Sequence, residues 1–247
     1  MQQYFVNSRA ENPVTITDKD TVKHMFNVMR LTEGDEVVLV FNDHIKRLAK
    51  VLDSAAHSFE IIEALSDNVE LPVQVTIASG FPKGDKLEFV AQKVTELGAA
   101  ALWAFPADWS VVKWDGKKLA KRQEKLDKVV LGAAEQSKRN LVPEVTLIEK
   151  KADFLKKLAD FDKIFIAYEE SAKEGEQAVL AHELAQAEAG QNLLFIFGPE
   201  GGISPEEVEA FEAAGAFKVG LGPRIMRTET APLYALSAVS YAFELAK

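Results

Sequence analysis

The rhythm of apolar and polar positions changes near residue 70. Before that point the apolar residues form short runs separated by turn signals such as Glu33-Gly34-Asp35. Four of these runs are strand candidates, at residues 3–6, 35–41, 45–53 and 57–65. One helical pattern stands among them at residues 20–30. Residues 1–70 are therefore predicted to form a small β-rich barrel.

A polar run from Ser66 to Pro72 predicts a linker, and beyond it apolar runs alternate with helical patterns. The long helical patterns cover residues 84–98 and 117–139. The strand candidates lie at residues 73–79, 100–107, 163–170, 192–198 and 217–222. This alternation predicts a second domain, residues 73–247, in which helices cover both faces of a parallel sheet.

The segment after the strand candidate at 192–198 carries a clear helix start. Ser204 is a good N-cap residue, Pro205 suits the first helical position, and Glu207 completes a capping box. Gly215 is placed to end this helix. The pattern predicts a short helix over residues 204–215.

Three glycines, Gly198, Gly201 and Gly202, stand between that strand and that helix. Open α/β sheets bind ligands at the carboxyl ends of their strands, and glycine lets a ligand approach the backbone. A tight turn from strand to helix explains the same residues. Both interpretations stay open from this loop alone.

A second glycine-bearing loop, "LGPRIMRTETAP", covers residues 221–232. Gly220 and Gly222 suggest a dinucleotide-binding fingerprint, but Ile225 stands where the third glycine belongs. The chain also has no G-x-x-x-x-G-K-[ST] phosphate loop and no G-x-S-x-G nucleophile turn. The common nucleotide-binding and hydrolase sites are therefore disfavoured.

The composition narrows the remaining chemistry. The chain has 247 residues, of which 47% are apolar and 27% charged, as in a globular protein large enough for two cores. It has no cysteine, and its four histidines show no ligand-like spacing, so we expect no metal site. Without a spanning apolar run or a signal-peptide pattern, we expect a cytoplasmic protein that has no membrane partner.

The charge is unevenly distributed along the chain. A formal net charge of -9 argues against indiscriminate binding to nucleic acid. Between Lys113 and Arg139, however, nine Lys and Arg stand against four Asp and Glu. This stripe is either a solvated helix face with i,i+4 pairs such as Glu124 and Lys128, or a surface that follows a phosphate backbone.

Several motifs in order along the chain resemble one family. They are "HMFNVMR" and "EGD", then "PKGDKLEFVAQKVTELG", "EQSKRNLVPE", "FGPEGGIS" and finally "LGPRIMRTETAPLYAL". Together they span nearly the whole chain. They are similar to the SPOUT methyltransferases, and specifically to the bacterial family that methylates N3 of a uridine in 16S ribosomal RNA.

The resemblance implies a SPOUT-type α/β domain with a parallel sheet and a C-terminal trefoil knot, preceded by a small β-barrel PUA-like domain. It implies a homodimer and a slot for S-adenosylmethionine between the two glycine-bearing loops. The implied cofactor-binding residues are Ile196, Gly198, Pro199, Glu200, Gly201, Gly202, Leu221, Gly222, Ile225 and Met226.

The resemblance further implies a substrate, uridine 1498 of 16S rRNA in the usual rRNA numbering, in the small ribosomal subunit. Arg227 would stabilise the charge that develops on the uracil, with Glu229 or Glu200 as the proton acceptor. A salt bridge between Arg227 and Glu229 that pins the knot or the dimer is the structural alternative. The RNA-binding candidates are Arg9, Arg30, Lys83, Lys86, Gln136, Arg139 and Arg224.

Two other functions remain open at this point. One is a SPOUT enzyme that methylates a ribose 2′-hydroxyl in transfer or ribosomal RNA. The other is an RNA-binding assembly factor that keeps the fold but has no activity. The ordered N-terminal domain and the "RIMRTETA" form argue against the first, and the identity of the methylated nucleoside would decide. The glycines and arginines present in both loops argue against the second.

Overall fold

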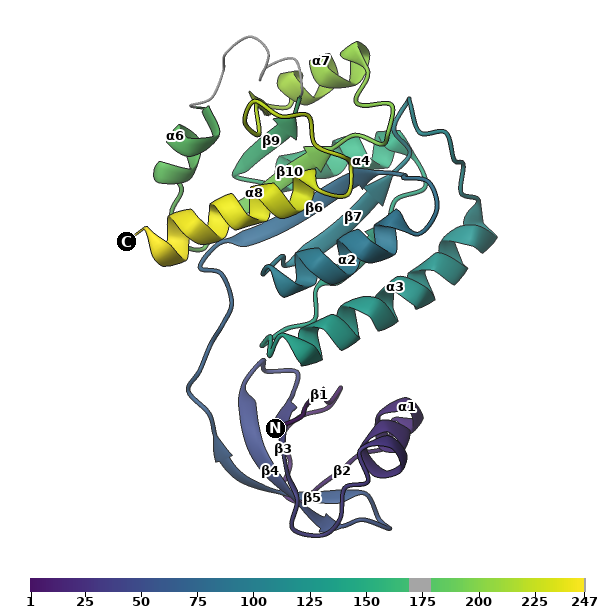
Figure 1. Ribbon diagram of the computed structural model, residues 1–247, viewed down its shortest axis with the longest axis vertical. Coiled ribbons are helices and arrows are strands. Elements are labelled where there is room, and N and C mark those ends of the chain that lie inside the picture. The colour runs from purple at the N-terminus through teal and green to yellow at the C-terminus, as the bar shows by residue number, and fades with distance from the viewer. Residues whose placement is uncertain (169–178, 247) are drawn as a thin grey trace. The chain divides into compact units, whose positions relative to one another are not determined.

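The computed structural model describes residues 1–168 and 179–246 (Figure 1). The chain divides into two compact units. The N-terminal unit consists of residues 1–70 with 134–141, and the C-terminal unit of residues 71–133 with 142–247. A short stretch from the middle of the chain thus belongs with the first 70 residues. The domain boundary near residue 70 stays a prediction.

The N-terminal unit is a curled five-stranded sheet in the order β1-β3-β4-β5-β2. Its strands are β1 (Gln3–Phe5), β2 (Val14–Thr15), β3 (Glu36–Val40), β4 (Lys46–Asp53) and β5 (Ser58–Ala64). Two register shifts between β4 and β5 bend the sheet. The predicted helix at 20–30 is present as α1 (Lys19–Val22) followed by one wider π-helical stretch, η1 (Lys23–Val28).

The C-terminal unit contains a six-stranded sheet in the order β11-β9-β10-β6-β7-β8. Its strands are β6 (Gln74–Gly80), β7 (Ala101–Phe105), β8 (Glu144–Leu147), β9 (Lys163–Ala167), β10 (Asn192–Phe197) and β11 (Phe217–Val219). Every neighbouring pair is parallel, which confirms the predicted sheet. The sequence pattern missed β8, a four-residue edge strand that pairs with β7 alone among the described strands. The end of the strand candidate at 163–170 lies outside the described residues.

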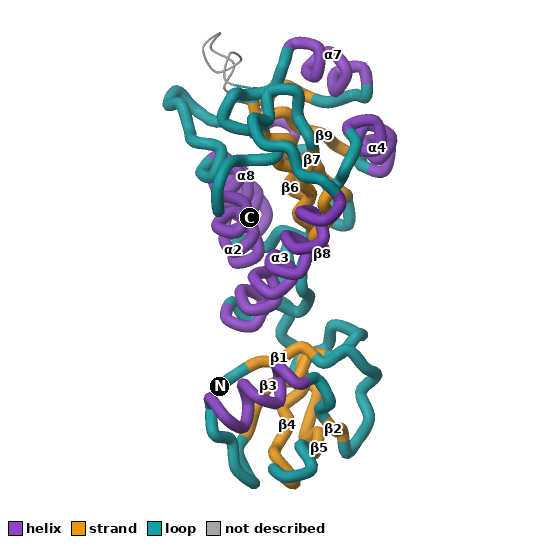
Figure 2. Tube along the Cα trace, turned by 90° about the vertical axis from the view of Figure 1, so that its right-hand side faces the viewer, coloured by secondary structure: helices purple, strands orange, loops and turns teal. Residues whose placement is uncertain are grey.

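Helices cover both faces of this sheet, as the alternation predicted (Figure 2). One face carries α2 (Lys86–Glu96), α3 (Gly116–Gln136), α6 (Val179–Ala185), and α8 (Ala231–Ser240) with its extension η3 (Tyr241–Leu245). The other carries α4 (Lys151–Lys157) with η2 (Leu158–Asp160), and α7 (Pro205–Ala213). Because both faces are covered, β10 buries every residue after Asn192.

The strand order reverses between β6 and β10. From β6 the chain moves outward to β7 and β8, whereas β9, β10 and β11 lie on the other side of β6. A crevice at the carboxyl ends of the strands is expected at such a switch point. The loop after β10 and the loop between β11 and α8 both end there. The trefoil knot that joins such loops stays a prediction.

Candidate functional site

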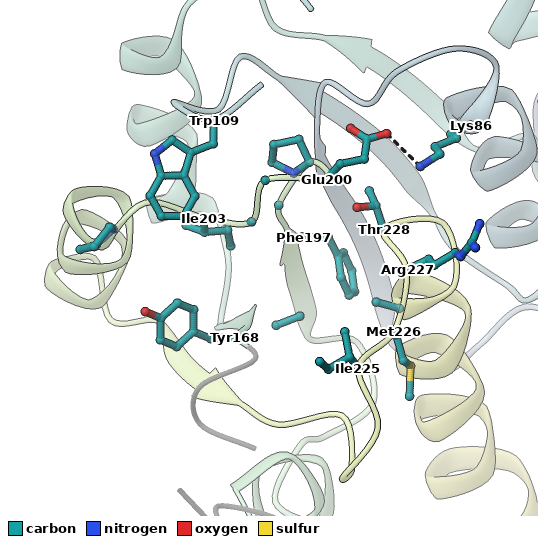
Figure 3. Close-up of a pocket in the computed structure, with 17 residues that line it drawn as sticks. Lys86, Trp109, Tyr168, Phe197, Glu200, Ile203, Ile225, Met226, Arg227 and Thr228 are labelled. Atoms are coloured by element: carbon teal, nitrogen blue, oxygen red, sulfur yellow. Dashed lines mark ion pairs between the residues drawn. The ribbon is translucent and has the colours of Figure 1, made fainter. Parts of the chain in front are cut away.

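A cavity of about 640 Å³ opens at the carboxyl ends of β9 and β10 (Figure 3). The loop after β10 (residues 198–203) and the loop before α8 (residues 225–228) form much of its wall. A smaller hollow of about 290 Å³ is lined by residues 221–226. It shares five wall residues with the cavity, one of which is Ala231. The two glycine-bearing motifs, which are separate in the sequence, therefore form one site.

The glycines of this site are required by the tight folding of the loop. A Cβ at Gly198 would lie 2.5 Å from the carbonyl carbon of Gly202. Gly202 has a φ of +85°, in the left-handed region that favours glycine. Gly80, at the end of β6, has the same function, because its Cβ would lie 2.5 Å from Cδ of Pro199. At Gly198 the structure thus supports the tight-turn interpretation, and it adds Gly80, which the sequence pattern did not single out.

The predicted capping box holds the far end of the loop. The Glu207 amide donates to Oγ of Ser204 at 3.1 Å, and the Ser204 amide donates to the Glu207 carboxylate at 3.2 Å. Oγ of Ser204 also donates to the Asp108 carboxylate at 2.9 Å. Asp108 pairs in turn with Lys151. The cap therefore fastens the glycine loop to the segment that carries Trp109, which lines the cavity.

Lys86, in the first turn of α2, lies at the edge of the cavity, where Figure 3 shows its ion pair with Glu200. It forms a second ion pair with Glu229. Its Nζ is 2.9 Å from Oε1 of Glu200 and 3.2 Å from Oε2 of Glu229. The backbone amide of Lys83 also donates to Oε1 of Glu200 at 3.1 Å. One ammonium thus joins α2 to both loops. The Lys86 side chain is thus already paired with two carboxylates, and its contact with RNA stays a prediction.

The ion pair changes the acidity of both groups. The hydrogen bond to Glu200 raises the pKa of Lys86 more than burial lowers it. For Glu200, burial acts to raise the pKa, but the hydrogen bonds from Lys86 and from backbone amides outweigh it and lower the pKa. A carboxylate with a lowered pKa is a weaker base. Glu200 is therefore poorly suited to act as a general base.

The arginines of the C-terminal loop lie open to solvent. The Arg227 side chain is 83% exposed, and its Nη1 is 3.9 Å from Oε1 of Glu229, at the outer limit of an ion pair. A pair this long and exposed is expected to contribute little to stability, and whether it pins the knot or the dimer stays open. Arg224 is exposed as well. Arg227 lines the cavity, and Arg224 lines the smaller hollow beside it.

The chain matches two family models and is similar to named relatives over nearly its whole length. Residues 69–240 match the family described as an RNA methyltransferase domain, and residues 16–63 match an RNA methyltransferase PUA domain. Ribosomal RNA small subunit methyltransferase E of Bacillus subtilis is 44% identical, covering 99% of this chain and 98% of the relative. The chain belongs to this methyltransferase family.

Other relatives agree with this assignment. The Mycobacterium bovis enzyme of the same name is 34% identical over 92% of this chain and 86% of its own. The enzyme from Neisseria gonorrhoeae, whose structure contains bound S-adenosyl methionine, is 27% identical with a TM-score of 0.82 over 98% of each chain. These matches confirm the SPOUT-type α/β class and the PUA-like unit that precedes it.

The structure brings most of the predicted cofactor residues of this methyltransferase together. Gly198, Pro199, Glu200, Gly201, Gly202, Ile225 and Met226 line the cavity, and Leu221 and Gly222 line the hollow beside it. Within the part of the chain that the structure describes, Ile196 lines neither the cavity nor the hollow. Its side chain is buried in the core on the sheet face covered by α4 and α7. The sequence analysis did not single out Tyr168, Trp109 or Thr228, which also line the cavity. Thr228 lies within the quoted C-terminal motif, whereas Tyr168 and Trp109 belong to none of the quoted motifs.

The predicted RNA-binding residues fall into two groups. Arg9, Arg30 and Gln136 are exposed on the N-terminal unit, and the Lys83 side chain is exposed on the C-terminal unit. Arg139 is only 2% exposed, and its Nε donates to the Glu70 carboxylate at 2.9 Å. The Arg139 guanidinium is thus engaged inside the N-terminal unit, and its contact with RNA stays a prediction.

Residues 1–168 and 179–246 were searched for metal-binding groups and for membrane-spanning helices. No group of three or more His, Cys, Asp or Glu there could hold a metal ion. Within the same residues no helix is both long and apolar enough to cross a membrane.

Proposed function

We propose that this enzyme transfers a methyl group from S-adenosylmethionine to N3 of a uridine in 16S rRNA, namely the uridine 1498 expected for the family. The observation that carries the proposal is the single cavity formed by the two motif loops at the switch point of the sheet. A relative that resembles the whole chain holds S-adenosyl methionine. The substrate follows from the name of the B. subtilis relative and the motifs quoted above.

The residues of the cavity fit this cofactor. Its volume of about 640 Å³ lies in the usual range for small-molecule sites. Ile225, Met226 and Leu221 offer apolar walls for an adenine ring, and the glycine loop offers backbone groups for its edge. When bound, the sulfonium supplies a methyl group already activated for transfer.

The protein's own contribution is to align the acceptor and to stabilise charge. As the N3 proton leaves, negative charge spreads onto the carbonyl oxygens of the uracil ring. The exposed Arg227 guanidinium is placed to stabilise that charge, and it cannot act as the base because arginine stays protonated. Of the two carboxylates, Glu229 is the better proton acceptor, because Glu200 has the shorter ion pair to Lys86 and the lowered pKa.

The pairing edge of a uracil carries N3, so the target base must be unpaired or flipped out to react. An acidic protein with local basic surfaces suits a structured target better than any free RNA. We therefore assign the assembled small subunit in the cytoplasm as the substrate. Weak methylation of naked 16S rRNA relative to subunits is expected, and equal rates on both would contradict this assignment.

A homodimer is also part of the proposal. Ile225 beside the cavity is 73% exposed, and apolar side chains on the C-terminal helix, Tyr234, Tyr241 and Leu245, are exposed as well. Large exposed apolar side chains gathered on neighbouring elements mark interaction surfaces. A second copy of the chain over this surface would also cover the open side of the cofactor cavity.

The deciding experiment is transfer of labelled methyl groups to small subunits that lack this modification, followed by nucleoside mass spectrometry. The expected product is N3-methyluridine. Label in a 2′-O-methylated nucleoside would show that the enzyme methylates a ribose hydroxyl and not N3 of uracil. The absence of label from every ribosomal RNA would reject the proposal.

The substitution Arg227→Lys separates catalysis from assembly. We expect the dimer to persist and kcat to fall by about 10- to 100-fold, because an ammonium does not reproduce the planar, delocalised guanidinium. Sedimentation and single-turnover kinetics would measure the two properties. Loss of the dimer together with activity would show that Arg227 has a structural role instead.

A further inference from the structure

A second concave surface lies beside the active-site cavity, in the same C-terminal unit. It has a volume of about 870 Å³ and is formed where the start of α2, the loop after β7 and the first half of α3 meet. Figure 1 shows α2 and α3 as neighbours, and the Glu88 carboxylate of α2 pairs with Arg122 and Lys125 of α3. We call this surface the α3 groove. Its lining residues are Asp85, Glu88, Val112, Lys113, Trp114, Lys118, Lys121, Arg122, Glu124, Lys125 and Lys128.

The cations of the groove stand in a regular array. Lys118, Lys121, Lys125 and Lys128 follow the i, i+3, i+7, i+10 spacing that places side chains on one face of a helix. They extend over about 15 Å of helix axis at 1.5 Å per residue. With Lys113 and Arg122, six cations line the groove against three carboxylates, in a chain whose net charge is -9.

Five of these six cations are of two kinds. Arg122 and Lys125 are held by protein contacts, since Glu88 pairs with both and the Arg122 guanidinium lies 4.1 Å above the Trp114 ring. Lys113, Lys118 and Lys121, by contrast, are exposed and make no ion pair with any described residue. The intramolecular-pair interpretation of the basic stripe therefore fails for these three lysines. Their charge is available to an anionic partner.

The α3 groove is also continuous along the chain with the active-site cavity. Lys86 lines the cavity, while Asp85 and Glu88 of the same turn line the groove. The loop after β7 contributes Trp109 to the cavity and Val112 to Trp114 to the groove. A polyanion bound in the groove would thus lie next to the place where the methyl group is transferred.

We propose that the α3 groove binds the RNA backbone that flanks the target uridine, with Lys113, Lys118 and Lys121 as its phosphate contacts. The backbone of an extended nucleic acid fits these three lysines, because exposed ammonium groups offer point charges to successive phosphates and form no shaped pocket for one small anion. The proposal deepens the proposed function and rests on it for the identity of the RNA.

The test compares Lys113→Gln/Lys118→Gln/Lys121→Gln with a matched control, Lys150→Gln/Lys156→Gln/Lys218→Gln. Both variants lose three positive charges, but the control residues lie on α4, its N-cap and β11. Lys150 is exposed, and Lys156 and Lys218 form surface ion pairs at 3.1 Å with Asp153 and 3.0 Å with Glu212. Binding to a 16S rRNA transcript is measured over a range of salt concentrations. Methyl transfer to small subunits that lack the modification and the Kd for S-adenosylmethionine are measured in parallel.

For the groove variant we expect RNA binding at least tenfold weaker than for the control at about 0.1 M salt, and a salt slope smaller by about 2. The Kd for S-adenosylmethionine and kcat at saturating RNA should match the wild type. Equal RNA affinity and equal salt slope in the two variants would overturn the proposal. Normal binding to the transcript with defective methylation of subunits would overturn it too, because the groove would then contact a ribosomal protein.

Failure of the proposed function would look different. If the wild-type protein produced no N3-methyluridine, the reaction assigned above would be wrong. The binding comparison between the two triple variants would still decide whether the groove holds RNA.

Discussion

At the scale of single residues, Lys86 has the largest influence on the geometry of the site. Its ammonium forms ion pairs with both Glu200 and Glu229, and it thereby links the two loops that form the cavity. Glu229 also faces Arg227, so the position of Lys86 affects the guanidinium that is expected to meet the substrate. One side chain on α2 thereby organises residues that lie far away in the sequence.

Replacing Lys86 with Met should lower kcat on the order of 100-fold, because two carboxylates would then face each other without a cation and the loops would separate. The repulsion raises the pKa of one carboxylate, so part of the activity should return as the pH is lowered. Lys86→Arg, which keeps the charge, should retain most of the activity. A pH–rate profile of both variants checks this. Equal losses in the two variants at all pH values would contradict a role based on charge.

Glu135 provides a prediction on stability. Burial raises the pKa of Glu135 to about 7, against smaller opposing effects of the Phe5 amide and Lys138. A carboxyl whose pKa is raised on folding stabilises the protein fully below about pH 4.5, and this contribution is lost as the pH rises through about 7. Glu135→Gln should therefore be more stable than the wild type at pH 8, by about 1 to 2 kcal/mol after allowance for solvent screening.

Urea unfolding at pH 5 and pH 8 would measure this effect. Glu124→Gln, at an exposed position of the same helix, is the matched control and should leave the pH dependence unchanged. A wild-type protein that is as stable at pH 8 as at pH 5, with no gain in the Glu135 variant, would contradict the prediction. Glu135 also raises the pKa of Tyr4, after the larger effect of burial, to about 12.

At the scale of elements, helix α7 and the glycine loop before it act as one piece. The capping box at Ser204 starts the helix, and the contact with Asp108 attaches that start to the loop after β7. Local sequence rules were sufficient to predict the cap, because its partners lie within four residues of each other. The contact with Asp108 joins separate segments, so no local rule could have predicted it.

Ser204→Ala should lower the free energy of unfolding by about 1 to 2 kcal/mol, because it removes the cap and leaves a buried helix amide without its acceptor. It should also weaken cofactor binding, since the glycine loop loses its anchor. Thermal unfolding and isothermal titration with S-adenosylmethionine measure the two effects. Ser204→Asp, which preserves an N-cap acceptor, is the control for helix stability. An unchanged Kd for S-adenosylmethionine in Ser204→Ala would show that the cap does not contribute to cofactor binding.

At the scale of the whole molecule, the C-terminal helix carries the surface proposed for the dimer. Tyr241 is 62% exposed and Leu245 is 72% exposed. Tyr241→Glu should convert the dimer to a monomer. Activity should fall in proportion to the loss of dimer, because the open side of the cavity is then no longer covered. Analytical ultracentrifugation with activity assays checks this. Leu52→Glu, at an exposed apolar position of β4, is the control and should change neither the oligomeric state nor the activity. A monomeric wild-type protein would refute the proposed dimer.

The sequence by itself determined the features that depend on near neighbours along the chain. These include the alternation that predicts the parallel sheet, the capping box at Ser204, the glycine loops, and the motifs that identify the family. Each is a repeating pattern or a short signal, so its physical cause lies within a few residues. The strand β8 was missed because four residues at a sheet edge carry too weak a pattern.

Only the tertiary structure decided which charges meet. Lys86 and Arg139 belong to the same motif-based list as Arg9 and Arg30, yet folding pairs Lys86 with Glu200 and Glu229 and buries Arg139 against Glu70. It leaves Lys113, Lys118 and Lys121 exposed in the α3 groove. Coulombic pairing depends on distance in space, and a linear pattern of charges does not contain that distance.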